Sequence, residues 1–326
     1  SLYEGMNLTF DPKDLNEMRA YFRTMYELTG REDYLYFATG RKEGKAPRQR
    51  NFPYQEAGIY VMRTGWGEED SYFHIHGVTL ERGEKSTHSH NDTGHLELQI
   101  RGEDILTDSG RYIYNSSCWK DQRQYFLSAK AHNTLYVDGH EMGTVPDVTR
   151  VRGVRMFCHR FEENKDYQLI DVSHNGYVYR DDPIYHRRRA ARFDHDVFVI
   201  DDQVTGTGLN EHDIRLYFNF APGILTRQEE GKYLYQTEKG RRYEIKFEAD
   251  QEICFEYLEG SEDPMGGWIS YGYGWKRPIP QLAVRAKGPV PVRFFTVIRP
   301  EGVYGEVKAQ GEKMKVILEP GRELIV

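Results

Sequence analysis

The segment Lys85-Ser-Thr-His-Ser-His-Asn-Asp-Thr-Gly-His-Leu-Glu-Leu-Gln-Ile100 holds the two signals from which the fold and the chemistry of this chain are inferred. From His95 to Ile100, apolar and polar side chains alternate, which is the period of a half-buried β-strand. The residues before this strand place His88 and His90 two positions apart in a polar stretch. The segment therefore predicts a strand preceded by a candidate metal-binding loop.

The alternation with period two continues through most of the chain after residue 57. Turn signals such as Asp138-Gly139 and Asn175-Gly176 separate the short runs. Many short strands without intervening helices predict a mainly β fold, a large, supersandwich-like antiparallel β-sandwich of two sheets. No repeat of fixed period is present, which disfavours a propeller or a solenoid. Strands are expected at 59–63, 72–76, 95–100, 134–137, 167–172, 197–200, 214–218, 243–247, 292–297 and 314–318.

The N-terminal part of the chain has a different pattern. Residues 11–29 predict a helix, with Asp11 as N-cap, Pro12 at the first helical position and Gly30 at the end. A second, short helix is expected from Arg31 to Thr39. Two helices make a hairpin but not a core of their own.

The sequence suggests three parts. Residues 1–45 form the helical hairpin, residues 46–56 a linker, and residues 57–326 the β-sandwich. The linker prediction rests on a polar stretch with two prolines and several basic residues. Charge runs of this kind usually face water, so we expect a solvated connector rather than an anion-binding patch.

Composition excludes two broad classes of protein. The net charge of −7 argues against a nucleic-acid-binding protein, which is normally basic. No apolar run approaches the roughly 20 residues of a membrane span. The 24 tyrosines suit strands, and they also suit a sugar-binding cleft. Three cysteines, Cys118, Cys158 and Cys254, form no motif and leave the redox compartment open.

Three segments bring candidate metal ligands together. They are His88-Ser-His90, Asp108 within Leu106-Thr-Asp-Ser-Gly110, and His132 within Ala131-His-Asn-Thr134. Three protein ligands and a water would complete a tetrahedral zinc ion. Each histidine taken alone is more often a hydrogen-bonded core or surface residue, and only their clustering favours a metal. His74 and His76 also alternate, but without an accompanying carboxylate motif they are expected to be ordinary sheet residues.

A cupin-type metal site is an alternative. Gly83, His88, His90 and Glu97 resemble the Gly, His-x-His and Glu pattern of cupins. The spacing between His90 and Glu97 is too long, however, and the second cupin motif is absent. This pattern is therefore weak.

The order of motifs resembles the C-terminal domain of the heparinase II/III-like polysaccharide lyases, which include heparinases and alginate and oligoalginate lyases. The resemblance rests on the His-x-His-x-Asp run from His88, the Leu-x-Asp-x-Gly turn with Tyr112, the pair Tyr125-Phe126, and the segment 128–139. The later segment 186–206, with its arginines and Val199-Ile-Asp-Asp, is also similar. The motifs cover residues 55 to 225.

This resemblance implies an architecture and a set of site residues. The family has an N-terminal (α/α) toroid followed by an antiparallel β-sandwich, so the hairpin resembles the remnant of a toroid that is mostly missing. His90, Asp108 and His132 would ligate Zn²⁺. His88 would be a catalytic residue that helps to neutralise the substrate carboxylate, and Tyr125 lies near the position of a catalytic tyrosine.

The implied reaction is β-elimination in a uronic-acid polysaccharide or oligosaccharide, such as a glycosaminoglycan or alginate. The zinc would organise the site, and this fragment alone would be inactive. We expect a bacterial protein, periplasmic or secreted rather than cytoplasmic, and leave a homodimer open. A non-catalytic carbohydrate-binding or structural sandwich is the second interpretation. Four arginines, Arg187, Arg188, Arg189 and Arg192, could form an anionic-sugar patch, but exposed surface arginines are the simpler expectation.

Overall fold

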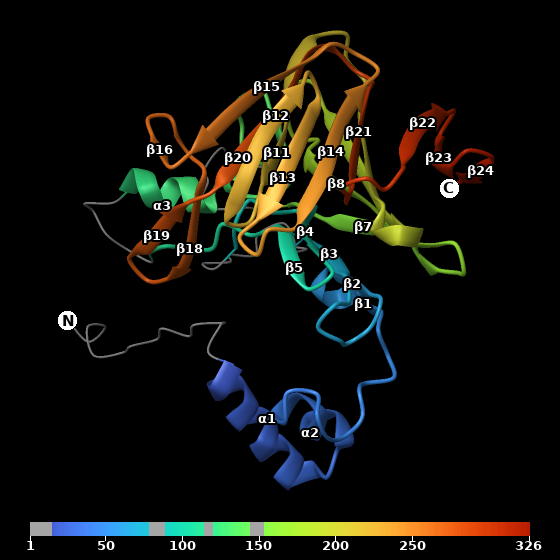
Figure 1. The fold of residues 1–326 in the computed structure, drawn as a ribbon. Helices are drawn as coiled ribbons and strands as arrows, with labels where there is room; N and C mark the ends of the chain where they lie inside the picture. The colour runs from blue at the N-terminus through green and yellow to red at the C-terminus, as the bar shows by residue number, and fades with distance from the viewer. Residues whose placement is uncertain (1–14, 78–88, 114–119, 144–152) are drawn as a thin grey trace.

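The N-terminal helical hairpin is present in the computed structural model, which describes residues 15–77, 89–113, 120–143 and 153–326 (Figure 1). Helix α1 spans Leu15–Thr29 and α2 spans Glu32–Ala38. The backbone N–H of Gly30 donates to the carbonyl of Tyr26 over 2.7 Å, and its φ of +67° closes α1 in the left-handed region that glycine favours. The expected start at Asp11 and Pro12 lies outside the described residues.

The hairpin contacts the first strands of the β region through aromatic and backbone groups. The ring centroids of Phe37 and Trp66 lie 5.5 Å apart, and Nε of Arg41 donates to the carbonyl of Trp66 over 2.8 Å. Trp66 belongs to the turn that follows β2 (Ile59–Arg63). Figure 1 shows the hairpin at one end of the molecule, near β1 and β2.

A five-stranded antiparallel sheet follows, in the order β1-β2-β3-β4-β5. Its other strands are β1 (Phe52–Tyr54), β3 (Tyr72–His76), β4 (His95–Ile100) and β5 (Glu103–Leu106). The ranges predicted for β2, β3 and β4 are confirmed. The structure differs over residues 46–56, because the expected linker ends in β1 and the short η1 (Gln55–Ala57). A proline is tolerated in β1 because β1 is an edge strand.

The largest sheet has eight strands in the order β12-β13-β14-β21-β10-β9-β8-β7. The seven pairs of neighbouring strands within it are all antiparallel. Its strands are β7 (Met156–Glu163), β8 (Tyr167–Tyr177), β9 (Ile184–Phe193), β10 (Phe198–Gly206), β12 (Gly223–Glu229), β13 (Lys232–Thr237), β14 (Arg242–Ala249) and β21 (Val292–Pro300).

A four-stranded antiparallel sheet completes the body, in the order β15-β20-β11-β6. Its strands are β6 (Leu135–Val137), β11 (Glu211–Asn219), β15 (Ile253–Glu259) and β20 (Pro280–Pro289). A bridge between Leu106 and Phe220 connects this sheet with the end of β5. Smaller pairs are β16 (Ser261–Glu262) with β17 (Met265–Gly266) and β18 (Trp268–Gly272) with β19 (Trp275–Pro278).

One helix interrupts the β region, so the expectation of strands without intervening helices is wrong there. Helix α3 spans Lys120–Leu127 and is followed by the short η3 (Ala129–Ala131). The α3 segment contains good helix formers and no glycine or proline, but its apolar residues gather at its end. The sequence therefore shows no helical apolar period. A further short helix, η4, spans Asp194–Asp196.

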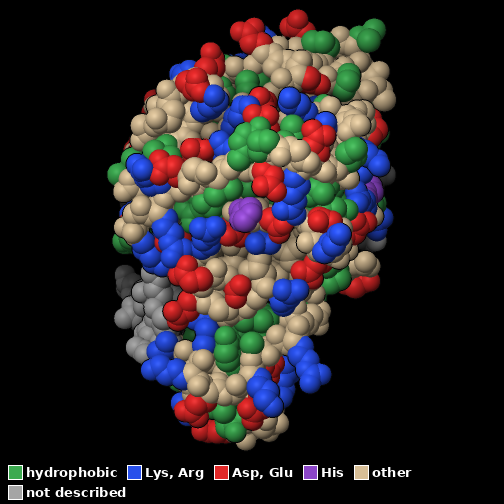
Figure 2. All heavy atoms as spheres, turned by 45° about the vertical axis from the view of Figure 1, so that its right-hand side comes forward, with side chains coloured by type: hydrophobic (Ala, Val, Ile, Leu, Met, Phe, Trp, Pro, Cys, Tyr) green, Lys and Arg blue, Asp and Glu red, His purple; other side chains and the backbone are tan. Residues whose placement is uncertain are grey.

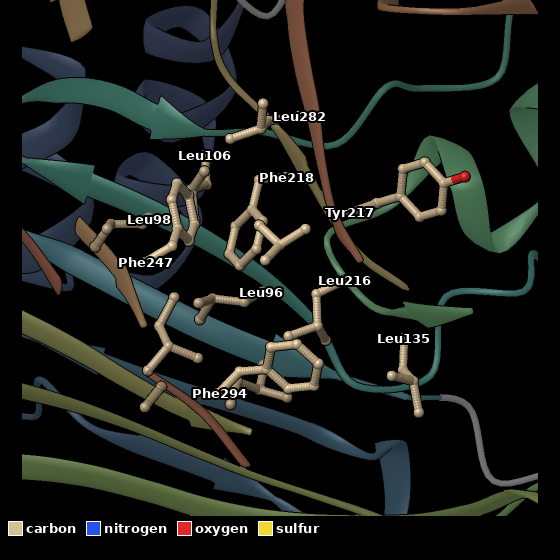
Figure 3. Close-up of a cluster of buried hydrophobic side chains, with 14 of the residues drawn as sticks. Leu96, Leu98, Leu106, Leu135, Leu216, Tyr217, Phe218, Phe247, Leu282 and Phe294 are labelled. Carbon is tan, nitrogen blue, oxygen red and sulfur yellow. The ribbon is translucent and has the colours of Figure 1, made fainter. Parts of the chain in front are cut away.

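The inner faces of the three large sheets share one hydrophobic cluster (Figure 3). Leu96 comes from β4, Leu216 and Phe218 from β11, Phe247 from β14 and Phe294 from β21. These side chains are at most 4% exposed. Alternation along each strand sends every second residue into this core. The mainly β, antiparallel fold expected from the sequence is confirmed, with three large sheets around the core where two were expected.

The outer face of the eight-stranded sheet is partly covered by the C-terminal strands β22 (Glu306–Gln310), β23 (Lys313–Glu319) and β24 (Arg322–Ile325). Met314 and Val316 of β23 pack with Leu169, Phe193 and other buried apolar residues in a second cluster. Figure 2 turns forward the side that carries these strands, and acidic and basic side chains are interspersed over it. None of the described helices is long and apolar enough to cross a membrane.

The arginines of β9 differ from expectation. Arg187 pairs with Asp171, Arg188 with Asp202, Arg189 with Asp201 and Arg192 with Asp196. The side chains of Arg188 and Arg189 are only 1% and 3% exposed. Both interpretations, exposed surface arginines and an anion-binding patch, are therefore wrong for these two residues.

Candidate metal centre

The candidate site begins on one face of the five-stranded sheet. In the antiparallel pairing of β3 with β4, His76 lies opposite His95 and His74 lies opposite Glu97. The residues between them, Ile75 on β3 and Leu96 on β4, point into the core. The same alternation that builds the core thus places three histidines and a carboxylate together on the other face.

Asp108 reaches this group from the turn after β5. Its Oδ1 accepts a hydrogen bond from the backbone N–H of Gly110 over 2.6 Å. Gly110 in turn forms a bridge with Ser270 and has a φ of +77°. The Leu-x-Asp-x-Gly motif therefore describes a turn in which glycine permits a close backbone contact and fixes the carboxylate.

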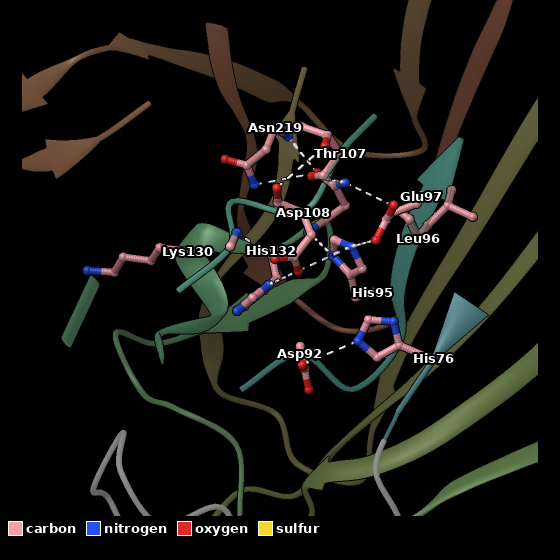
Figure 4. A network of polar contacts seen from close by, with 12 residues as sticks. His76, Asp92, His95, Leu96, Glu97, Thr107, Asp108, Lys130, His132 and Asn219 are labelled. Carbon is pink, nitrogen blue, oxygen red and sulfur yellow. Dashed lines mark hydrogen bonds and ion pairs between the residues drawn. The ribbon is translucent and has the colours of Figure 1, made fainter. Parts of the chain in front are cut away.

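His132 is the residue that the structure places at the centre of the cluster (Figure 4). It ends η3, its side chain is fully buried, and its Nδ1 lies 2.9 Å from Oδ2 of Asp108. Its Nε2 is buried and has no hydrogen-bond partner among the described residues. A buried nitrogen without a partner costs about 1–3 kcal/mol, which binding of an ion there would offset.

Asn133 connects the segments that carry the cluster. Its side-chain Nδ2 donates to the carbonyls of Leu96 and Thr107 over 2.8 and 3.0 Å, and its Oδ1 accepts from the backbone N–H of Asn219 over 2.5 Å. Its own backbone N–H donates to Nδ1 of His95 over 2.8 Å. The Ala-His-Asn-Thr motif thus combines a candidate ligand with the residue that fixes its surroundings.

The hydrogen bond from Asn133 decides the role of His95. Because Nδ1 of His95 accepts a hydrogen bond, the neutral ring carries its proton on Nε2. This Nε2 faces Oδ2 of Asp108 at 3.6 Å and Oε1 of Glu97 at 3.8 Å. Ligation of a metal through Nε2 would require an imidazolate. His95 is therefore better suited to orient the carboxylates than to bind an ion.

The structure contains two overlapping groups with metal-ligand spacing. Among the described residues, the first group consists of His90, Asp92 and His132, and the second consists of His95, Asp108 and His132. In each group, the candidate ligand atoms lie within 4.8 Å of one another. The structure therefore brings His90 and Asp108 each to His132 but assigns them to separate groups. The set His90, Asp108 and His132 stays a prediction.

Electrostatics put His90 and Asp108 in the protonation states that a metal requires, whereas Asp108 outweighs burial and raises the pKa of His132, whose proton a bound metal would displace. Burial, together with the charge of His132, lowers the pKa of His90 to about 4, so its imidazole is neutral at pH 7. Burial would raise the pKa of Asp108, but the neighbouring histidines, His132 above all, hold it well below its usual range. Histidine binds zinc as the neutral imidazole, and aspartate binds it as the ionised carboxylate.

The donor set and its burial therefore fit a zinc ion. The nitrogen and carboxylate donors are those found in zinc sites, and the partnerless Nε2 of buried His132 offers a lone pair. His88 lies outside the described residues, so the structure says nothing of its position.

The sequence interpretation missed the part played by His74, His76 and Asp92. Nε2 of His76 lies 3.3 Å from Oδ2 of Asp92, and His74 lies 3.7 Å from Glu97. Burial disfavours the charged form of His76, but Asp92 outweighs it and raises the pKa of His76 to about 9. Burial lowers the pKa of His74 to about 4. The alternation of His74 and His76 opposite Glu97 was the available signal. Glu97 lies near His74 and His95 and does not belong to the group of candidate ligands around His90. In a cupin, by contrast, the glutamate binds the same metal as the two histidines of the motif.

Tyr125 lies on α3 in a small cluster of its own. Its side chain is 5% exposed, and its hydroxyl accepts a hydrogen bond from Nε2 of Gln281 over 3.1 Å and contacts the backbone N–H of Trp268 at 3.5 Å. Burial raises the pKa of Tyr125 to about 12. These contacts are those of a structural residue, and the catalytic role of Tyr125 stays a prediction.

Gly110→Ala is expected to destabilise the protein more than Gly139→Ala. Both glycines have φ near +75°, so both substitutions carry the same backbone strain. A Cβ at Gly110 would lie 2.1 Å from the carbonyl oxygen of Ser270, whereas one at Gly139 meets nothing within 4 Å. We expect an additional loss of about 1–3 kcal/mol in the free energy of unfolding for Gly110→Ala, measured by urea titration. Equal losses in the two variants would refute the close contact.

A second buried polar cluster lies behind the site, on β8, β9 and β10. The backbone N–H of Gly176 donates to Nδ1 of His174 over 3.1 Å. Nε2 of His174 then donates to Nδ1 of His186 over 2.9 Å, and Nε2 of His186 donates to Oδ1 of Asp202 over 2.7 Å. The direction of this chain of hydrogen bonds is fixed at its first donor, and it requires both imidazoles to be neutral.

This chain of hydrogen bonds predicts a loss of stability in mild acid. Burial, together with the charges of His186 and Arg188, holds the pKa of His174 well below its ordinary value. Above pH 6.5 the ring is neutral in both states, and below it only the unfolded chain takes up the proton. The contribution of His174 to the free energy of unfolding then falls by up to about 1.4 kcal/mol per pH unit. His174→Asn should reduce the slope of stability against pH by this amount, as urea titrations between pH 7 and 5 can measure. An unchanged slope would contradict the assignment.

The chain matches a protein-family model described as "Heparinase II/III-like, C-terminal" over residues 46–315. It is 24% identical to a heparin-sulfate lyase of Bacteroides stercoris over 292 residues, which cover 87% of this chain and 40% of that protein. A heparin-sulfate lyase of Bacteroides thetaiotaomicron is 28% identical over 201 residues, which cover 59% of this chain and 26% of that protein. The chain thus spans less than half of the length of these relatives.

Solved structures show the same fold. A heparinase III gene product superposes with a TM-score of 0.79 and 21% identity, over 96% of this chain and 47% of that one. A heparan sulfate lyase from Pedobacter heparinus superposes with a TM-score of 0.78 and 17% identity, over 96% of this chain and 48% of that one. At these identities the likeness establishes the fold alone.

Proposed function

This chain belongs to the heparinase II/III-like family through its C-terminal domain, and we propose that it is the zinc-bearing part of a lyase that cleaves uronic-acid glycans by β-elimination. The observation that carries the proposal is the buried cluster around His132, with its partnerless nitrogen and its ionised carboxylates. The names of the relatives, heparin-sulfate lyases, support a glycosaminoglycan as the substrate class.

We propose that His90, Asp108 and His132 hold the zinc. The two groups of ligand atoms share His132, which supports its place in the set. The zinc would supply a fixed positive charge that organises the surrounding loops near an anionic substrate. Asp92 and His95 would act around these ligands, with His95 oriented by the backbone of Asn133.

The reaction needs a base, an acid and a partner for the uronate carboxylate. Removal of the C5 proton and departure of the C4 oxygen leave a double bond between C4 and C5, and the proton required by the leaving oxygen comes from the acid. Negative charge develops on the carboxylate next to C5 and needs a positive or hydrogen-bonding partner. We propose His88 for this partner, from the family resemblance.

The remaining catalytic groups would come from another part of the enzyme. The chain covers 40% of the Bacteroides stercoris relative, which leaves room for a further domain. We propose that α1 and α2 are the end of a helical toroid. Tyr21 and Leu28 on α1 are 57% and 75% exposed, which supports the presence of a neighbouring domain over this helix. The isolated chain is then expected to be inactive.

The assay is a screen of the intact enzyme against heparan sulfate, alginate and other uronate glycans. The unsaturated product of elimination absorbs in the ultraviolet because its new double bond is conjugated with the carboxylate. A rise in absorbance with at least one glycan is expected. Absence of a rise with every uronate polymer, in enzyme that is folded and loaded with zinc, would refute the proposed activity. Binding without turnover would instead favour a carbohydrate-binding domain.

A further inference from the structure

Arg188 is the largest fully buried side chain among the described residues, and it lies near the candidate metal centre. It lies in the middle of β9 on the face that points into the sandwich, and it is 1% exposed. Its Nε and one terminal nitrogen donate to the two oxygens of Asp202 over 2.7 and 3.1 Å. Its other terminal nitrogen donates to the backbone carbonyls of Gly94 and Asn133 over 2.8 and 2.5 Å.

The two carbonyls belong to the two segments that carry the cluster. Gly94 immediately precedes His95, and Asn133 immediately follows His132. One guanidinium group on the eight-stranded sheet thus holds the backbone beside both histidines. None of these four hydrogen bonds of Arg188 goes to a candidate ligand itself, so its effect on the site passes through the backbone.

The orientation of the guanidinium is itself fixed. Asp202 accepts from Arg188 and also from Nε2 of His186, which completes the chain of hydrogen bonds that starts at Gly176. The planar guanidinium reaches a carboxylate and two carbonyls at the same time because its donors are held in a rigid fork. Lysine has one ammonium group on a flexible stem and cannot reproduce this geometry.

Stability alone is a poor explanation for this arrangement. Burial of an ion pair costs desolvation energy that often cancels its attraction, so buried pairs are weak evidence for stability. The neighbouring pair Arg189–Asp201 is buried to a similar degree, 3% and 0% exposed, but faces the opposite side of β9. A terminal nitrogen of Arg189 donates to the carbonyl of Glu312. Arg189 is therefore a matched control without contacts to the site.

We propose that Arg188 is a positioning residue that sets the zinc affinity of the centre by holding the backbone carbonyls of Gly94 and Asn133. This inference rests on the zinc assignment of the proposed function. It gives a role to Arg188 within the arginine-rich segment 186–192 and to Asp202, which the proposed chemistry leaves without one. Replacing a residue that orients metal ligands without binding the metal typically weakens metal affinity by about 10–100-fold.

The test compares Arg188→Lys with Arg189→Lys in the full chain. The zinc dissociation constant is measured by competition with a chelating dye, and the melting temperature is measured beside it. We expect roughly 10–100-fold weaker zinc binding in Arg188→Lys, and a change of less than about threefold in Arg189→Lys. The visible spectrum of the cobalt-substituted protein should also change in Arg188→Lys alone, because the ligand geometry changes.

The outcomes separate the two proposals. Wild-type affinity and spectrum in folded Arg188→Lys would overturn the positioning role and leave the zinc site intact. Equal losses of affinity in both variants, in proportion to their melting temperatures, would overturn it as well. Absence of zinc binding by the wild type would overturn the zinc assignment, and the positioning role with it. Asp202→Asn, which keeps the side-chain volume, is the second variant if Arg188→Lys does not fold, and a smaller loss in the same direction is expected.

Discussion

His132→Ala is expected to remove high-affinity zinc binding, with a dissociation constant that rises on the order of 100-fold or more. His132 is the residue common to both groups of candidate ligands, and its buried Nε2 has no partner among the described residues. Its replacement also leaves Asp108 without the hydrogen bond to Nδ1. Loss of one ligand and of the orientation of another should act together.

His159→Ala is the control for this prediction. His159 lies on β7, its Nε2 lies 2.7 Å from the hydroxyl of Ser173, and it belongs to neither group of candidate ligands. Zinc titration of both variants should show wild-type affinity for His159→Ala alone. If His132→Ala bound zinc as tightly as the wild type, the metal centre described above would be wrong.

Phe218→Ala is expected to lower the free energy of unfolding by about 3–5 kcal/mol. Phe218 on β11 is 1% exposed, and its ring centroid lies 5.1 Å from that of Phe247 on β14 (Figure 3). The side chain thus joins the four-stranded and eight-stranded sheets across the core. Its removal leaves a cavity in addition to the lost burial of apolar surface.

Phe157→Ala is the matched control, since it removes the same atoms from a ring that is 47% exposed. Urea titration at one pH should show a loss of less than about 1 kcal/mol for this variant. Similar losses in the two variants would contradict the placement of Phe218 between the sheets.

The strands were the most predictable part of the fold. The segments 59–63, 72–76 and 95–100 form β2, β3 and β4 with the expected bounds. In β3 and β4 apolar residues that face the core alternate with polar residues on the other face, which is the period-two pattern visible in the sequence. Strand β20 was not predicted. Pro280–Leu282 and its other early residues are all buried, so little alternation is visible in its sequence.

The candidate site was predictable in its segments but not in its contacts. His90, Asp108 and His132 stood out because histidines and carboxylates recurred beside turn signals. The partners of His132 and His95 depend on which strands pair, since the hydrogen bond from Asn133 to His95 joins residues 38 positions apart. The long-range ion pair Arg188–Asp202 was hidden for a related reason. A run of three arginines is typical of a solvated surface, and only the pairing of β9 with β10 places Asp202 opposite Arg188 and Asp201 opposite Arg189.

We propose that His90, Asp108 and His132 hold a zinc ion in this domain. Anomalous X-ray diffraction from crystals of the zinc-loaded protein, recorded on both sides of the zinc absorption edge, tests it most directly. We expect one anomalous peak per chain at bonding distance from these three side chains. A peak bound by other residues, or no peak in crystals grown with zinc, would contradict it.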